Sequence, residues 1–170
     1  GCPMIFRPYR RLNAVLYAHH WAYGRNPRFY DYEELGGDCT NFASQCVYAG
    51  AGVMNYTPVY GWYYIDPDNK APAWTGVEYF YSFLTRPQIS LGPVARETND
   101  LRLAQPGDVI QLRFSGPVFQ HSPVVVQTSP DGSPDKILLA AHSSDADWRP
   151  LSSYEYEAYR VLHILGFYDE

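Results

Sequence analysis

One cysteine stands where its thiol could act as a nucleophile. Residues 36–46 read GGDCTNFASQC, with a glycine pair and an acid directly before Cys39. The pattern predicts a helix that begins at Cys39, where the helix dipole and unpaired N–H groups favour a thiolate. The glycines would let a substrate backbone come close. Because cysteine is also among the most frequently buried residues, an inert residue at a helix start is the competing interpretation.

Two histidines in the second half of the chain could serve such a thiol. Between Phe119 and His142, two apolar runs flank Asp131-Gly132, a pair that favours a tight hairpin turn. In a hairpin symmetric about that pair, His121 and His142 are direct cross-strand neighbours, so one imidazole can orient the other. Nearby prolines can widen the turn, and a slip of one residue would move the pairing to the opposite face.

Other uses of these side chains are weighed against a thiol nucleophile with a histidine base. A zinc site from Cys39, His121 and His142 is chemically possible but lacks the close ligand pairs of typical zinc motifs, so no metal or cofactor is expected. Cys39 and Cys46 lie about 10 Å apart along a helix, too far for a disulfide. Cys46 is therefore expected in the core, and Cys2 adds an odd thiol.

The remaining polar candidates receive structural roles. Asp38 is predicted to be the N-cap of the helix that begins at Cys39, because its charge would oppose a thiolate. His19 and His20 fall on the first predicted helix and His163 on the last predicted strand, and all three are interpreted as structural.

Charge and hydropathy exclude some classes of partner. The net charge is −5, Lys and Arg together number 13, and no basic run occurs, so the chain has no electrostatic footprint for nucleic acid. The longest apolar runs, 137–141 and 124–126, are far too short to cross a bilayer. No signal peptide is visible, which leaves the compartment open because the N-terminus can be a trimmed end.

The 170 residues suit one α+β domain, with helices in the first half and an antiparallel sheet in the second. Helices are predicted over 10–23 and 39–49, the second closed by Gly50 and Gly52, and a capping box at 75–78 opens a third helix that ends at Phe83. Strands are predicted over four ranges: 108–114, 119–128, 136–142 and 159–167.

Aromatic residues make up 16% of the chain, with 16 Tyr and 4 Trp. Four of them gather in and after the loop that follows the second helix: Trp62, Tyr63, Tyr64 and Trp74. Such side chains could line a groove for a sugar or peptide chain, or form an aromatic lid on the core.

Several segments together resemble a known family. They are GGDCTNFASQC, the YGWYY of 60–64, the PGDVIQ of 106–111, the HSPVV of 121–125, and the AHS of 141–143 followed by PLS at 150–152. In this order they resemble the bacterial "Putative amidase domain" family, over about Tyr9 to Gly166. That family is placed with the papain-like cysteine peptidases, alongside the NlpC-type and CHAP cell-wall hydrolases.

The resemblance implies a role for each matching residue. Cys39 would be the nucleophile at a helix N-terminus, His121 the general base at the start of a strand, and His142 the third member on the next strand. Asp145 or Asp147 could take that third position if the hairpin register differs. Tyr30 or Tyr32 would correspond to the tyrosine that assists the oxyanion in NlpC-type relatives.

The implied reaction is acyl transfer from an amide or peptide bond, commonly in the stem peptides of peptidoglycan. A papain-like or NlpC-like fold and a location in the bacterial cell envelope, or outside the cell, follow from the same resemblance. Two alternatives stay open: an acyltransferase that uses the same nucleophile, and a noncatalytic module that binds the cell wall.

Overall fold

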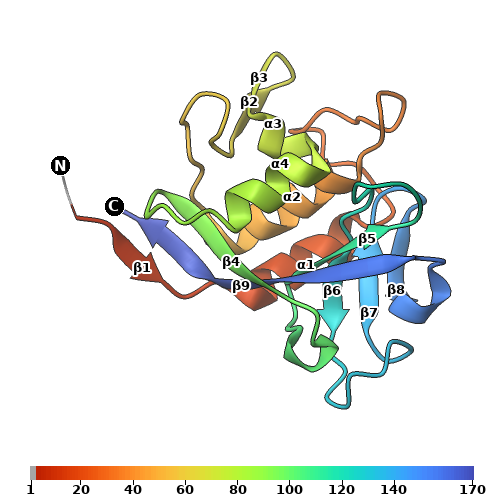
Figure 1. Ribbon diagram of the computed structural model, residues 1–170. Coiled ribbons are helices and arrows are strands. Elements are labelled where there is room, and N and C mark those ends of the chain that lie inside the picture. The colour runs from red at the N-terminus through yellow and green to blue at the C-terminus, as the bar shows by residue number, and fades with distance from the viewer. Residues whose placement is uncertain (1–2) are drawn as a thin grey trace.

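A curled antiparallel sheet, shaped like half of a barrel, carries four helices on its concave side in the computed structural model (Figure 1). The structure describes residues 3–170, and Cys2 lies outside this range. The expected mixed α and β composition with an antiparallel sheet is confirmed. Helices and strands are less strictly separated along the chain than predicted, because the first strand precedes the first helix.

Helix α2 (Cys39–Ala51) is the central element, with almost every side chain buried. Helix α1 (Arg11–Trp21) packs along it, and the short α3 (Pro72–Thr75) and α4 (Val77–Leu84) cover its other side. Among the described residues, no helix combines the length and the apolar character that a bilayer span requires.

The main sheet has the order β1-β9-β5-β6-β7-β8, and β4 also pairs with β9. The long β9 is the central strand of the sheet's pairing, because different parts of it pair with β1, β4 and β5. A separate hairpin joins β2 and β3. The strand bounds are Ile5–Arg7 (β1), Tyr64–Asp66 (β2), Asn69–Lys70 (β3), Gly92–Thr98 (β4), Val109–Arg113 (β5), Val124–Gln127 (β6), Leu138–Ala141 (β7), Ala146–Pro150 (β8) and Ala158–Asp169 (β9).

Both faces of the sheet are buried where β5, β6 and β9 meet. Alternate residues such as Val109, Val124 and Leu162 pack against the helices. Their neighbours Ile110 and Val125 pack into a second cluster on the opposite face. This explains why apolar runs, rather than a strict polar–apolar alternation, mark these strands in the sequence.

The four predicted strands all form, while β1, β4 and β8 of the main sheet were not predicted. Strand β4 begins Gly-Pro and carries charged residues, a weak local signal that its pairing with β9 overrides. The predicted capping box at 75–78 is wrong. Gly76 occupies the N-cap of α4 in an extended conformation, and the Glu78 carboxylate accepts bonds from the Phe119 amide and from Arg160.

The two glycines expected to close α2 have different roles. Gly52 ends the helix in a left-handed conformation, with φ 70°, as predicted. Gly50 instead lies inside the helix at a close crossing with the N-terminal segment. A Cβ there would lie 2.4 Å from Cε1 of Tyr9 and 2.9 Å from the carbonyl oxygen of Arg10.

Replacing Gly50 with Ala should therefore destabilise the protein, although Gly→Ala within a helix usually stabilises it. We expect the free energy of unfolding to fall by about 1–3 kcal/mol, the usual range for overpacking, as measured by denaturant titration. Gly24→Ala is the control, because its Cβ would meet only Cε3 of Trp21 at 3.7 Å. Equal stability of the two variants would contradict the close crossing.

Candidate active site

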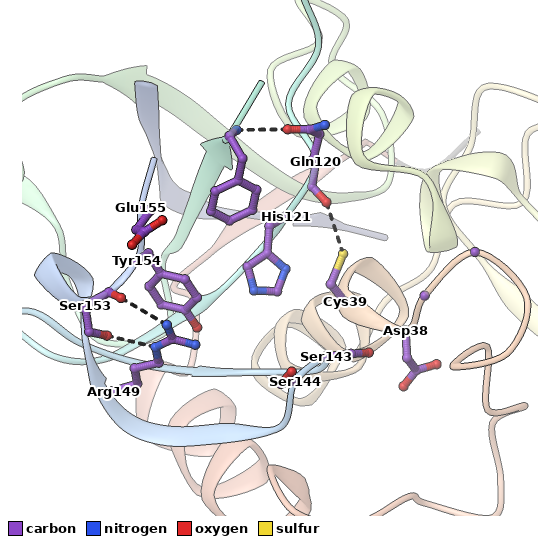
Figure 2. A pocket seen from close by; sticks show the side chains of 13 residues that line it. Asp38, Cys39, Gln120, His121, Ser143, Ser144, Arg149, Ser153, Tyr154 and Glu155 are labelled. Carbon is purple, nitrogen blue, oxygen red and sulfur yellow. Dashed lines mark hydrogen bonds between the residues drawn. The ribbon is translucent and has the colours of Figure 1, made fainter. Parts of the chain in front are cut away.

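An open pocket of about 700 Å³ lies where the start of α2 faces the end of the sheet that carries His121 (Figure 2). Segments from four parts of the chain contribute to it, which brings both Cys39 and His121 to its wall. The lining residues are Gly36, Gly37, Asp38, Cys39, Phe114, Gln120, His121, Ser143, Ser144, Arg149, Ser153, Tyr154 and Glu155.

Cys39 is the first residue of α2, as predicted. Its Sγ lies 3.7 Å from Oγ1 of Thr40 and 3.9 Å from the carbonyl oxygen of Gln120. Gly36 and Gly37 both have positive φ, and a Cβ on either would meet nothing within 4 Å. These glycines are therefore required for the backbone path into the helix, and they leave open space beside the thiol.

His121 is held at the pocket wall by backbone pairing with β5. The amide of Leu112 donates to its carbonyl oxygen at 3.0 Å, just before β6 begins. The imidazole packs against the rings of Phe114 and Tyr154, with centroid separations of 6.1 and 5.6 Å. Within residues 3–170, neither ring nitrogen is hydrogen-bonded to a protein group. Aromatic packing, not a polar third residue, therefore sets the orientation of this ring.

A buried pair of hydroxyls couples the two candidate residues. Thr40 and Ser122 directly follow Cys39 and His121, and their side-chain oxygens lie 3.1 Å apart. Nε2 of Gln111 donates to the Ser122 oxygen at 3.2 Å. The Ser122 hydroxyl is then free to donate to Thr40, whose own hydroxyl can donate towards Sγ of Cys39. This chain of donors fixes the helix start against the sheet.

The electrostatics favour an uncharged thiol and imidazole at rest. Burial raises the pKa of the Cys39 thiol, although the hydrogen bond with Thr40 opposes the shift. Burial, together with the smaller effect of the positive charge of Arg149, lowers the pKa of His121 to about 4. At neutral pH the imidazole is therefore an unprotonated base. The structure does not support the thiolate that the helix start alone would favour.

His142 does not lie opposite His121. Val124 pairs with Ala140, whereas the register symmetric about Asp131-Gly132 would pair it with Leu139. This slip of one residue turns His142 to the helix-covered face of the sheet, where its ring stacks on Phe42 at 4.1 Å. The predicted cross-strand pair of imidazoles is therefore wrong.

His142 instead forms a buried cluster with Asp38. Its Nδ1 donates to Oδ2 of Asp38 at 2.6 Å, and its Nε2 lies 2.8 Å from the carbonyl oxygen of Trp21. Asp38 also accepts bonds from the Tyr32 amide and the Asn41 side chain. Burial acts to raise the pKa of Asp38, but these bonds, that to His142 above all, outweigh it and lower the pKa.

The predicted capping role of Asp38 is also wrong. It occupies the N-cap position, but its side chain makes no capping bond to the first turn of α2. The carboxylate instead bonds with His142, the Tyr32 amide and the Asn41 side chain. Asp38 therefore anchors the segment that leads into Cys39.

The alternative third residues and the candidate tyrosines lie outside the pocket. Asp145 pairs with Arg25, and Asp147 pairs with Nδ1 of His19 at 2.8 Å. Tyr30 and Tyr32 pack against each other with tilted rings, and neither lines the pocket. The structural interpretation of His19 and His163 is supported by their bonds to Asp147 and Asp108.

The aromatic loop contributes mainly to the core. Trp62 and Trp74 are fully buried, Tyr64 is nearly so, and Tyr63 packs against the same cluster. None of the four lines the pocket around Cys39. The groove interpretation of these residues is therefore wrong, and the core interpretation is confirmed.

The cysteines and histidines do not converge on a metal. Cys39 and Cys46 are both free thiols, and Cys46 is fully buried in the core, as predicted. Over residues 3–170, no group of three or more His, Cys, Asp or Glu side chains is placed to hold an ion. Because His142 turns to Asp38, the ligand set of the zinc alternative does not assemble.

Several pocket residues were not identified from the sequence, among them Phe114, Arg149, Tyr154 and Glu155. Arg149 lies on β8 and Tyr154 follows the 3₁₀ turn η2 (Leu151–Ser153), and neither element was predicted. No motif marks Arg149 or Tyr154, because long-range pairing of β8 with β7 brings this part of the chain to the pocket.

Comparison with known proteins agrees with the segments noted in the sequence. The family described as "Putative amidase domain" matches residues 8–165. "Uncharacterized protein YhbB" of Bacillus subtilis (strain 168) is 31% identical over 153 residues, which cover 89% of this chain and 47% of the relative. The chain thus spans about half the length of that relative, and no solved structure matches significantly. The chain belongs to the "Putative amidase domain" family, whose description indicates an enzyme that hydrolyses amide bonds.

Proposed function

We propose that this chain is a single papain-like domain of a cysteine-dependent hydrolase, which cleaves an amide or peptide bond through a thioester acyl-enzyme. One observation carries the proposal: the Cys39 thiol and the His121 imidazole, from distant parts of the sequence, meet at the wall of one pocket. A thiol at a helix start facing a histidine on an antiparallel sheet is the arrangement that nucleophilic catalysis by cysteine requires.

The first half of the reaction begins with the Cys39 thiol and the His121 imidazole both uncharged. His121 takes the thiol proton of Cys39 as the sulfur attacks the amide carbonyl carbon. The first N–H groups of α2 have no intrahelical acceptor, so they can hold the developing oxyanion. The imidazolium then gives its proton to the departing amine, and the acyl group remains on sulfur as a thioester.

The second half regenerates the enzyme. Water replaces the amine in the pocket, and neutral His121 accepts a proton from it as its oxygen attacks the thioester carbon. Collapse of the tetrahedral intermediate releases the carboxylic acid, and the sulfur recovers its proton from the imidazolium. The donor chain from Gln111 through Ser122 to Thr40 stabilises negative charge on sulfur in both halves.

We assign His142 a positioning role in place of the third catalytic position. Its bond to Asp38 holds the residue directly before Cys39, and His142 itself does not line the pocket. Loss of this bond would leave a buried carboxylate without its strongest partner, so it would disturb the helix start rather than the basicity of His121.

Peptides of the bacterial cell wall are the proposed substrates. The family resemblance supports this class, because NlpC-type and CHAP hydrolases act on the cell wall. The open pocket, whose rim carries the hydroxyls of Ser143, Ser144 and Ser153, suits an extended polar chain.

An uncharged Cys39 thiol beside an uncharged His121 imidazole predicts how the thiols react with iodoacetamide at neutral pH. Cys39 should be alkylated faster than the buried Cys46, and His121→Ala should slow the reaction at Cys39 about tenfold or more, because the base is lost. Peptide mapping by mass spectrometry resolves the two sites. His20→Ala is the matched control, since His20 is exposed and outside the pocket. Equal, slow labelling of Cys39 and Cys46 would contradict the proposal.

Turnover is tested with soluble peptidoglycan stem peptides, by following the release of free amino groups. Wild type should cleave them with or without a chelator, while Cys39→Ala should reduce the rate by several orders of magnitude. Faster turnover with an added amine acceptor would instead indicate an acyltransferase. The noncatalytic module would replace the proposal if wild type bound cell-wall sacculi without cleaving any substrate, and if Cys39→Ala bound the sacculi equally well.

A further inference from the structure

Arg149 is the only arginine or lysine among the residues that line the pocket. Its Nε donates to Oγ of Ser153 at 2.8 Å, and its Nη2 donates to the Ser153 carbonyl oxygen at 3.1 Å. Its Nη1 takes part in neither bond, and the guanidinium forms no ion pair with a carboxylate of residues 3–170. A cation without a counter-ion therefore stands in the proposed active site.

The guanidinium is held in place before any ligand arrives. Its carbon lies 3.6 Å from the centroid of the Tyr154 ring, so the two groups stack. The Tyr154 ring also packs against His121. Figure 2 shows Arg149 and Tyr154 on one side of His121, with Cys39 on its other side. Because its side chain is already ordered, the guanidinium would lose little conformational entropy on binding an anion.

The negative charges of the pocket leave Arg149 available. Asp38 directs its carboxylate to His142, Asn41 and the Tyr32 amide. Glu155 is exposed to solvent and has no ion pair with Arg149. An unpaired, ordered guanidinium is the group that proteins use to bind carboxylates, often with two parallel hydrogen bonds.

From these contacts we infer that Arg149 binds a carboxylate of the substrate, so that the hydrolase prefers amides whose neighbouring residue carries a free carboxylate. The inference rests on the proposed function of Cys39 and His121, and it names the substrate class of the same pocket. The carboxylate can be the C-terminus of a peptide or the side chain of an acidic residue.

Substrate binding would then also strengthen the base. The positive charge of Arg149 is one of the two causes that lower the pKa of His121, after burial. A carboxylate bound to Arg149 compensates that charge and makes His121 more basic. A substrate with the carboxylate would thus find a more effective base than one without it.

The test uses alkylating reagents that differ only in a carboxylate, so it needs no known substrate. N-iodoacetylglycine carries a terminal carboxylate, and N-iodoacetyl-isoasparagine carries only a side-chain carboxylate. Each is compared with its uncharged amide in the reaction with Cys39. In every case the sulfur displaces iodide, a carbon–sulfur bond forms, and the thiol proton passes to His121 and on to solvent.

In wild type, at least one carboxylate reagent should react with Cys39 faster than its uncharged amide. Arg149→Gln should lower this ratio of rates about tenfold or more, because one charge-assisted hydrogen bond is lost. Arg149→Lys should retain part of the preference. Arg96→Gln is the control, since Arg96 is exposed and outside this pocket, and Glu155→Gln should not lower the preference. The reagent that shows the preference identifies a terminal or a side-chain carboxylate as the ligand.

Two failures can be told apart. The role of Arg149 alone would be overturned if the uncharged amides labelled Cys39 fast and in a His121-dependent way, but the carboxylate reagents showed no preference. A carboxylate preference that stayed the same in Arg149→Gln would overturn it as well. Slow labelling by every reagent, unchanged in His121→Ala, would overturn the proposed function itself. The rate with the uncharged amides also reports whether Arg149→Gln has left the pocket intact.

Discussion

The hydrogen bond between the hydroxyls of Thr40 and Ser122 is the contact on which the candidate site depends. It joins the residue after Cys39 to the residue after His121, and both side chains are almost completely buried. A buried hydroxyl left without a partner is costly, so this bond restricts how helix α2 can lie against the sheet. Gln111 and Arg160 continue the network into β5 and β9. The thiol and the imidazole thus face each other because the residues beside them are bonded.

Two separate groups of polar residues surround this contact. Asp38, His142 and Arg25 form a buried cluster behind the start of α2, which fixes the loop that delivers Cys39. Tyr154 and Arg149 form the other group, in which Tyr154 packs against His121 and the positive charge of Arg149 lowers the pKa of His121. The first group fixes the backbone before Cys39, and the second determines the surroundings of the His121 imidazole.

Local signals in the sequence were sufficient for some parts of the structure and not for others. The helix start at Cys39 depends on neighbouring residues and formed as predicted. The predicted strand over 119–128 forms only as β6 from Val124, and His121 before it pairs with Leu112 as an isolated bridge. The hairpin register depends on a long turn and on an irregularity between Val125 and Gln127. The observed pairing of β6 with β7 is therefore shifted by one residue from the pairing symmetric about Asp131-Gly132. Arg149 could not be found from local sequence, because only pairing of β8 with β7 brings it to the pocket.

The pH dependence of Cys39 alkylation by iodoacetamide tests the central claim, a thiol served by a neutral His121, most directly. With the pKa of His121 lowered to about 4, the base is active above that pH and is lost as the pH falls through it. Wild type should therefore keep an almost constant rate from neutral pH down to about pH 4. In His121→Ala only the thiolate can react, so the rate should fall about tenfold per pH unit. Identical, steep profiles for both proteins would contradict the account.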